Sequence, residues 1–491
     1  MTRYLWRWLI LIGVAAVAFH ESVDRTLSWG SATSVSYSVA TVVMALVMFL
    51  GIELQRRTDL PIHDREVDWI IGLLALVLSV SLRIVLAPRL IEWFDLLRLD
   101  ILSFFVFLFG ASTLLFGTRF TLRFGLAWIV LLMYSSPVFL VVTLLCGGGW
   151  TGAGYATTVG VAVATVVAAG GSLRCRAVAG TVVAVVGGVL TFLTGRVIID
   201  EDTVGAASLT VLPALVGVTV AVLLDAWVRR TRPTVRRQAP SVGTIRLAVV
   251  PILGTAVILA VVPLPDRLIT SVTADAPGAD SDSVGVPVPV GWSQIGEETF
   301  DWADRYFGAG TVLSRQKLRA DTVVADWDED GRYREVVVDT LVPGSGVPPQ
   351  RFGDESFYDS VSGRRSPKID VDLGHGVTGN VHTVFDENNF LTYTHLRFSW
   401  RGEDPADDSG NGNTGPVHYV SVIAVDDHRA SARFPEFTDS LNGLAGRIVT
   451  VLLRGGAVTE DASATYKDLD LVTSVGRGII DARWTGAEVA S

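Results

Sequence analysis

Residues 68–88 read DWIIGLLALVLSVSLRIVLAP, a stretch in which apolar side chains follow one another almost without interruption. A helix rises about 1.5 Å per residue, so about 20 such residues cross the roughly 30 Å hydrocarbon core of a bilayer. This stretch therefore predicts a membrane-spanning helix. Eight further segments of the same kind precede residue 270, at 4–20, 34–54, 99–117, 121–145, 151–170, 177–199, 204–228 and 244–264.

The composition of the chain changes near residue 270. Residues 1–270 carry a net charge of +6, whereas residues 271–491 carry −16. The acidic part has no basic stripe that would neutralise phosphates, so nucleic acid is not an expected partner. A solvated acidic surface of this kind fits a salt-adapted, halophilic organism, in which salt screens self-repulsion.

The arginines in the loops predict how the helices cross the membrane, because cytoplasmic loops are enriched in basic residues. If the N-terminus is cytoplasmic, 14 loop arginines lie inside and five lie outside. The sequence therefore predicts a multi-pass protein of the cell membrane with a cytoplasmic N-terminus and, after nine spans, an extracytoplasmic C-terminal domain. The five outer arginines are Arg25, Arg89, Arg98, Arg196 and Arg267.

We expect three parts along the chain. Residues 1–268 form a polytopic α-helical membrane bundle, residues 269–290 form a linker rich in Ser, Asp, Gly and Pro, and residues 291–491 form an α+β domain. Alternating apolar and polar residues predict strands in that domain, most clearly from Phe390 to Trp400, and an antiparallel sheet. The strand-like runs are 319–327, 332–342, 369–373, 380–386, 390–400 and 417–425.

Two helices are expected to accompany this sheet. A short one follows Gly291-Trp292, and an amphipathic one begins at Phe434 and ends before Gly455-Gly456. The first carries Phe300, Trp302, Tyr306 and Phe307, and the second carries Phe437, Leu441, Leu444, Ile448 and Leu452 at helical spacing.

The acidic segment Asp326–Gly331 resembles the opening of a calcium-binding loop. The twelfth position of such a loop needs a bidentate glutamate, but Val337 stands there. Asp-Gly between two strand-like runs is also a strong hairpin signal. The sequence favours a turn between strands, with calcium binding as the alternative.

The acidic domain shows no pattern typical of a metal site or a cysteine enzyme. None of its five histidines has the spacing of a zinc ligand set, and the domain contains no cysteine. His395 alternates with Tyr393 and Arg397 on one face of a strand, which predicts a surface histidine. Neither a cofactor nor a metal is expected.

Cys146 and Arg196 are the candidate catalytic residues of the membrane part. Both lie at the predicted outer ends of spans, and Arg83 lies toward the outer end of another. An arginine beside a cysteine lowers the pKa of the thiol and favours the nucleophilic thiolate. The alternative is that Arg83 and Arg196 extend to the outer interface and Cys146 is a small helix-end residue.

The run from Asp100 to Val142 contains Leu108-Phe109-Gly110, Leu115-Phe116-Gly117 and Pro137, and it resembles the middle of the exosortase/archaeosortase family. These are polytopic transpeptidase-like enzymes that process C-terminal sorting signals of surface proteins. The resemblance implies that Cys146 matches the family's cysteine and that Arg196 matches its later arginine.

The acidic tail resembles the methanolan-biosynthesis-type domain that is fused to some exosortases, on the basis of Gly291-Trp292 and Tyr306-Phe307-Gly308. The two resemblances imply surface-protein sorting, or export and assembly of a surface polysaccharide. The expected partners are then the lipid bilayer and a surface protein with a C-terminal sorting signal, or a surface glycan. A second hypothesis is a non-catalytic membrane scaffold whose outer domain binds such a partner. A transporter is disfavoured, because paired carboxylates in mid-membrane are lacking.

Overall fold

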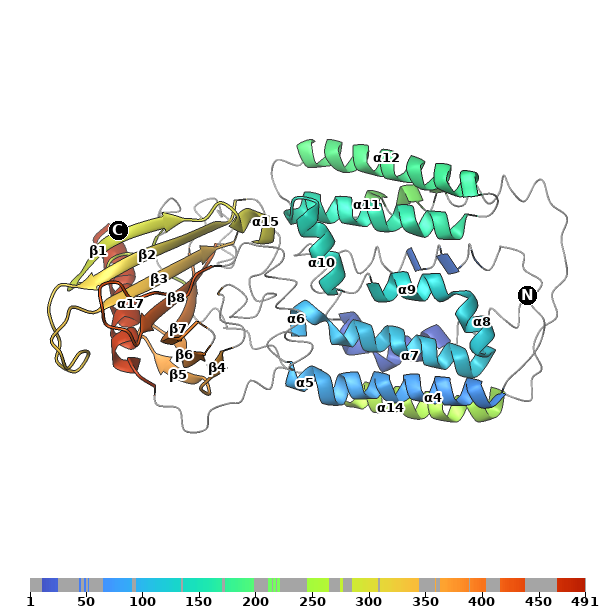
Figure 1. Ribbon diagram of the computed structural model, residues 1–491, viewed down its shortest axis with the longest axis horizontal. Helices are drawn as coiled ribbons and strands as arrows, with labels where there is room; N and C mark the ends of the chain where they lie inside the picture. Colours follow the sequence, from blue (N-terminus) through green and yellow to red (C-terminus); the bar gives the residue numbers. More distant parts are fainter. Residues whose placement is uncertain are drawn as a thin grey trace. The chain divides into compact units, whose positions relative to one another are not determined.

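The computed structural model divides the chain into two compact units, Met1–Arg267 and Leu268–Ser491, and each is described by itself (Figure 1). In the first, the described residues are 11–24, 44–45, 48–49, 52, 65–90, 94–133, 136–169, 173–197, 211–213, 215–217, 219–220 and 245–264. In the second, they are 274–276, 285–307, 310–343, 358, 363–387, 389–402, 416–437 and 466–490.

The first unit is helical. Four of its described helices are long and apolar enough to cross a membrane, namely Arg65–Arg89, Leu99–Phe116, Gly149–Ala168 and Leu173–Arg196. The elements are α4 (Arg65–Ser81), the π-helical turn η2 (Leu82–Leu86), α5 (Ala87–Arg89), α6 (Phe94–Leu97), α7 (Leu99–Phe116), α8 (Thr118–Arg123), α9 (Gly125–Met133), α10 (Ser136–Leu145), α11 (Gly149–Ala168), α12 (Leu173–Val197) and α14 (Ile245–Val261).

The predicted span 121–145 is not one straight helix. Its two helical parts, Gly125–Leu132 and Pro137–Leu145, meet at an angle of 73°. Pro137 lies in the first turn of the second part, where proline is well tolerated.

Other predicted spans fall partly or mostly beyond the described residues, so the count of nine stays a prediction. The segments 34–54 and 204–228 are described at a few positions only, and 4–20 is described from Leu11 onward. The segment 244–264 contains α14, whose apolar part, Leu247–Val261, is shorter than a typical span.

Small residues allow close approach between helices of the first unit. A Cβ on Gly110 of α7 would lie 2.9 Å from the Cβ of Ala75 and 3.0 Å from the backbone oxygen of Gly72, both in α4. A Cβ on Gly187 of α12 would lie 2.8 Å from the Cγ2 of Thr158 in α11. These helix pairs lie side by side in Figure 1.

The second unit is an antiparallel sheet of eight strands, which confirms the predicted sheet. The strand order is β1-β2-β3-β8-β7-β6-β4, and β5 also pairs with β6. The strands are β1 (Trp292–Thr299), β2 (Val312–Ala320), β3 (Glu335–Val342), β4 (Arg364–Arg365), β5 (Ile369–Asp372), β6 (Thr378–Asp386), β7 (Leu391–Arg401) and β8 (Val417–Val425); the helices are α15 (Ala303–Phe307) and α17 (Leu469–Ala490).

The core of this unit lies between one face of the sheet and α17. Because side chains alternate along a strand, every second residue of the central strands contributes to this core. The strand residues include Val336, Val338, Leu396, Phe398, Val420 and Val422, and the helix residues include Leu471, Val472, Val475, Ile479 and Ile480.

The strands β3 and β5 to β8 follow the predicted runs closely, but β1 and β2 do not. Residues 292–299 form β1, where a helix was expected to begin, and α15 starts only at Ala303. The predicted run 319–327 is displaced, since β2 ends at Ala320 and a turn includes Trp327. The reason is that Ser314 and Gln316 are polar yet buried, which hides the apolar alternation of β2.

Two further expectations concern segments around this sheet. The predicted helix from Phe434 differs at its beginning, since Phe437 forms an isolated bridge with Tyr358, and residues 438–465 lie outside the described residues. In the predicted linker, Ala276 and Val286 are buried in the core. Ala276 donates its backbone N–H to the carbonyl of Arg401, so these linker residues pack as part of the domain.

Candidate functional site

The helical unit places Cys146 and Arg196 at the same end of the α11–α12 pair. Gly195, in the last turn of α12, lies beside Thr151, in the first turn of α11, since a Cβ on Gly195 would lie 2.9 Å from the Cγ2 of Thr151. Cys146 precedes the start of α11 by three residues, and Arg196 follows Gly195 directly. Cys175 lies in the first turn of α12, at the opposite end of that helix.

The interactions of Cys146 and Arg196 are local. The half-buried Cys146 donates its backbone N–H to the carbonyl of Val142 and so extends α10. The guanidinium of Arg196 lies 5.3 Å from the ring centroid of Phe192, one turn earlier on α12. Within the described part of the helical unit, no contact joins Arg196 to Cys146, so the pairing that would activate the thiol stays a prediction.

Arg83 lies inside the helical unit and does not extend to an interface. Its side chain is 1% exposed, and its guanidinium donates to the carbonyl of Val262 at 2.7 and 3.0 Å and to Glu21 at 3.1 Å. Glu21 also accepts the backbone N–H of Leu264 at 2.8 Å. Arg83 therefore joins three segments of the bundle, which makes it a structural residue.

In the sheet unit, Asp328 organises the connection between β2 and β3. One carboxylate oxygen accepts the backbone N–H groups of Asp330 and Arg332, and the other lies 2.6 Å from Nδ1 of His428. This geometry confirms the turn interpretation of Asp326–Gly331. Among the residues that the structure describes, no three side chains of His, Cys, Asp or Glu gather as a metal site would require.

Arg334 is the buried centre of a polar network around Asp328. Its guanidinium is 3% exposed, donates to the carbonyls of Trp327 and Val425 at 3.1 Å each, and pairs with Asp468 at 2.9 Å. It also contacts Nε2 of His428. The network ties the β2–β3 turn, the start of β3, the segment after β8 and the beginning of α17 together.

The tautomer of His428 follows from these contacts. A guanidinium only donates hydrogen bonds, so Nε2 of His428 accepts from Arg334 and its Nδ1–H donates to Asp328. Burial alone raises the pKa of Asp328, but hydrogen bonds from the backbone N–H of Arg332 and from His428 outweigh it and lower the pKa. At Asp468 burial dominates and raises the pKa, despite the opposing charge of Arg334.

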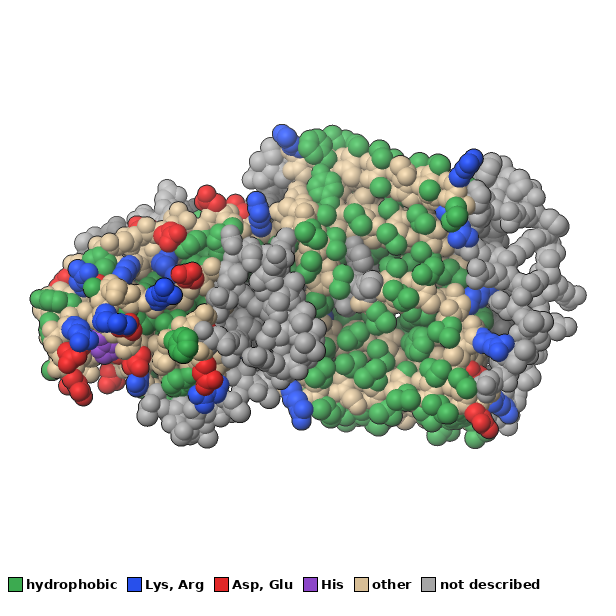
Figure 2. Space-filling view, in the orientation of Figure 1, with side chains coloured by type: hydrophobic (Ala, Val, Ile, Leu, Met, Phe, Trp, Pro, Cys, Tyr) green, Lys and Arg blue, Asp and Glu red, His purple; other side chains and the backbone are tan. Residues whose placement is uncertain are grey.

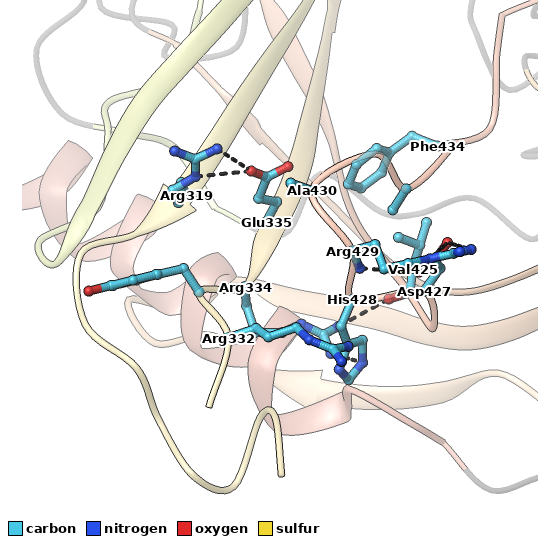
Figure 3. Close-up of a pocket in the computed structure, with 12 residues that line it drawn as sticks. Arg319, Arg332, Arg334, Glu335, Val425, Asp427, His428, Arg429, Ala430 and Phe434 are labelled. Carbon is cyan, nitrogen blue, oxygen red and sulfur yellow. Dashed lines mark hydrogen bonds and ion pairs between the residues drawn. The ribbon is translucent and has the colours of Figure 1, made fainter. Parts of the chain in front are cut away.

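A pocket of about 300 Å³ lies beside this network (Figure 3). Its lining includes two carboxylates, from Glu335 and Asp427, and an apolar side formed by Val425, Ala430, Ala432 and Phe434. The lining also contains four guanidinium groups, which makes the pocket rich in arginine within a strongly acidic domain. These arginines are Arg319, Arg332, Arg334 and Arg429.

Three of these arginines are held by ion pairs at one edge of the guanidinium. Nε and Nη2 of Arg319 both bind one oxygen of Glu335, at 2.9 and 2.6 Å. Nε and Nη2 of Arg429 bind Asp427 at 2.8 and 2.7 Å, and Nη2 of Arg332 binds Asp330 at 2.7 Å.

The outer edges of the same three arginines are available to a ligand. A guanidinium carries five N–H donors, and the described residues do not engage Nη1 of Arg319, Arg332 or Arg429. The three side chains are 46%, 47% and 72% exposed.

The pairing keeps the carboxylates of the pocket ionised. At Glu335 burial raises the pKa, but hydrogen bonds from Lys317 and Arg319 outweigh it and lower the pKa. Hydrogen bonds from the side chain and backbone of Arg429 lower the pKa of Asp427 to about 2. The pocket therefore keeps fixed acceptors beside its donors.

A second polar cluster lies on the face of the sheet opposite α17. Arg315 and Asp339 form a two-point ion pair at 2.7 and 2.9 Å, and the hydroxyl of Tyr358 donates to Asp339 at 2.8 Å. Phe437 stacks on Tyr358, and the guanidinium of Arg315 lies 4.3 Å from the ring centroid of Phe437. These side chains cover this face of the central strands.

His395 lies under this cluster, so the prediction of a surface histidine is wrong. Its side chain is fully buried, with the ring of Tyr358 edge-on at 5.6 Å and the ring of His382 at 5.1 Å. Burial first, and then the charges of Lys368 and Arg365, lower its pKa to about 3. Alternation along one strand cannot show that the opposite face of the sheet is also covered.

The sequence did not point to the arginine pocket, because its residues are scattered over three segments. They come from the end of β2, the segment 332–335 and the segment 425–434. Comparison with protein-family models, with curated proteins and with solved structures finds no match to this chain. What this chain does therefore has to be inferred from its own geometry.

Proposed function

We propose that this chain is a multi-pass membrane protein whose C-terminal domain faces the outside of the cell and binds an acidic partner at the cell surface. The observation that carries the proposal is the arginine-lined pocket within a domain of net charge −16. A concentration of arginine in an acidic domain serves binding or structure, and Arg319, Arg332 and Arg429 each have an outward edge that no described residue engages.

Support for the membrane placement comes from the surface of the helical unit. Large apolar side chains are exposed along its helices, and charged side chains lie toward the helix ends (Figure 2). Exposed apolar surface of this extent needs lipid or protein to cover it. Examples are Ile70, Leu74 and Val77 on α4, Val182, Val185 and Val189 on α12, and Leu247, Val250 and Val257 on α14.

Binding is tested with the full-length chain in detergent, applied to immobilised polygalacturonate, immobilised polyglutamate and neutral dextran at physiological salt. We expect retention on at least one acidic matrix and none on dextran. The double variant Arg319→Gln/Arg429→Gln should lose that retention, because it removes two of the open guanidinium edges. Equal retention of the wild type on dextran, or of the variant on the acidic matrices, would refute the proposal.

A second candidate is an exosortase-like sorting enzyme, and the shared location of Cys146 and Arg196 at one end of the α11–α12 pair favours it. In that case the thiolate of Cys146 forms an acyl intermediate during cleavage of a partner's C-terminal segment. The variant Cys146→Ser should remain folded while unprocessed partner accumulates. Cys175→Ser is the matched control, and loss of processing in both variants would argue against a role for Cys146.

A further inference from the structure

We infer that the arginine pocket binds the carboxylate-bearing ring of an acidic sugar, so that the surface partner is a uronate-containing glycan. This inference rests on the proposed function and names the chemistry of its ligand. Three properties of the pocket lead to it: the placement of the open guanidinium edges, the fixed carboxylates between them, and the apolar wall.

The open guanidinium edges come from separate segments around the pocket. Arg319 is at the end of β2, Arg332 precedes β3, and Arg429 follows β8 (Figure 3). The two N–H groups on one edge of a guanidinium match the two oxygens of a carboxylate. Two contacts with a carboxylate orient the guanidinium groups of Arg319 and Arg429, whereas Arg332 makes a single contact with the exposed Asp330.

The carboxylates in the lining favour a sugar over a phosphate group. Glu335 and Asp427 would repel the second charge of a phosphate, whereas the hydroxyl groups of a sugar donate hydrogen bonds to them. Both carboxylates stay ionised through their pairs with arginine, so they act as acceptors over the working pH range. A ligand with one carboxylate and several hydroxyls uses both kinds of group.

The apolar wall and the size of the pocket fit a sugar ring. Phe434 and Val425 contribute apolar surface to the lining of the pocket (Figure 3). The ammonium of Lys317 lies 5.6 Å from the ring centroid of Phe434, which helps to fix that ring. A volume of about 300 Å³ is at the lower end of the range for small-molecule sites and suits a short segment of a glycan.

Arg334 is not one of the ligand-binding groups. Its guanidinium is committed to Asp468, to His428 and to two backbone carbonyls, and it is buried. Its part is to hold the segments 325–334 and 425–429 together, which keeps Arg332 and Arg429 at fixed positions. The pocket is thus preorganised, which lowers the entropic cost of binding.

The test is isothermal titration of the full-length chain in detergent with four probes: trigalacturonate, its methyl ester, neutral galactotriose and triglutamate. We expect trigalacturonate to bind about tenfold or more tightly than the ester and the neutral sugar, because both lack the carboxylate charge. Arg319→Gln/Arg429→Gln should weaken trigalacturonate binding by a similar factor. Arg364→Gln is the matched control, since Arg364 is also exposed and paired with a carboxylate, Glu387, but lies outside the pocket lining.

The outcomes separate the inference from the proposed function. Equal binding of trigalacturonate and its methyl ester, or equal loss in the Arg364→Gln control, overturns the sugar inference. Binding of triglutamate alone, if the double variant abolishes it, also overturns the sugar inference and leaves the proposed function standing. If neither trigalacturonate nor triglutamate binds, the sugar inference and the proposed function are both overturned.

Discussion

Arg334 shows how one buried charge organises the sheet unit. It satisfies Asp468, His428 and two carbonyl groups that would otherwise lie in a dry environment. We predict that Arg334→Met destabilises the unit by about 3–5 kcal/mol, because removing one partner of a buried ion pair leaves the other charge uncompensated. Urea unfolding of the full-length chain, followed by tryptophan fluorescence, measures the loss.

The control for that experiment is Arg332→Met, two residues earlier. Arg332 is half exposed and pairs with the exposed Asp330, and a surface pair of this kind contributes at most about 1 kcal/mol. If both variants lower the free energy of unfolding by the same amount, the buried network does not stabilise the unit more than a surface ion pair does.

His395 predicts how the stability of the sheet unit depends on pH. Its pKa is lowered from 6.5 to about 3 in the folded state, so below pH 6.5 the unfolded chain binds a proton that the folded chain does not. The contribution of His395 to the free energy of unfolding is therefore complete above pH 6.5. It falls by up to about 1.4 kcal/mol per pH unit on acidification toward pH 3. Burial also lowers the pKa of the neighbouring His382, which adds to the effect.

The variant His395→Leu tests this pH dependence. It lacks the titrating ring, so its stability should fall less between pH 7.5 and pH 5 than that of the wild type, in urea unfolding at each pH. His375→Leu is the control, because His375 is exposed and pairs with Asp481 at the surface. An unchanged pH dependence in His395→Leu would contradict the assignment.

At the scale of elements, α17 packs closely on the sheet because glycine occupies the contact. A Cβ on Gly476 of α17 would lie 2.6 Å from Cδ2 of Leu396, and a Cβ on Gly379 of β6 would lie 2.6 Å from its Cδ1. Leu396 is fully buried between these two glycines and has no room to move aside. The helix position is therefore set by the contact between Gly476 and Leu396.

We predict that Gly476→Ala destabilises the sheet unit by about 1–3 kcal/mol, even though alanine is the better helix former by about 1 kcal/mol. Thermal unfolding of the full-length chain measures the change. Gly296→Ala in β1 is the control, since the nearest atom to its Cβ would be 3.8 Å away. A stabilised Gly476→Ala variant would show that the helix can shift on the sheet at little cost.

The sequence predicted the elements whose pattern is complete within one segment. The apolar run 68–88 and the alternating run 390–400 correspond to the helix Arg65–Arg89 and to β7, because length or period alone identifies them. The closing helix α17 was missed, since Gly476, Gly478 and Arg477 interrupt its apolar pattern. In the structure those glycines serve packing, which sequence propensity cannot reveal.

The candidate pocket could not be predicted in the same way. Its arginines lie on β2, before β3 and after β8, and only the strand order β2-β3-β8 brings them together. Each of these segments by itself reads as an ordinary charged surface loop or strand. In the sequence, Arg332 and Arg334 lie close together, but Arg429 belongs to a distant segment, so the sequence alone gives no sign that these arginines share a cavity.

At the scale of the whole molecule, the arginine distribution of 14 loop residues inside against five outside predicts the orientation of the chain. Protease added to intact spheroplasts should remove the part beyond about residue 270 and leave the helical part protected. Immunoblots against tags at each terminus record which part survives. Protection of the C-terminal tag until the membrane is lysed would reverse the orientation.

The contrast between the acidic domain and its arginine-lined pocket has a consequence for the proposed partner. A net charge of −16 repels any polyanion at a distance, whereas the attraction of the arginines is felt only near the pocket. Duplex DNA, with one charge per roughly 1.7 Å, is expected to meet the full repulsion before it reaches the arginines. A polymer with widely spaced carboxylates would meet far less repulsion, so the proposed binding of an acidic glycan predicts selection by charge density before recognition by shape.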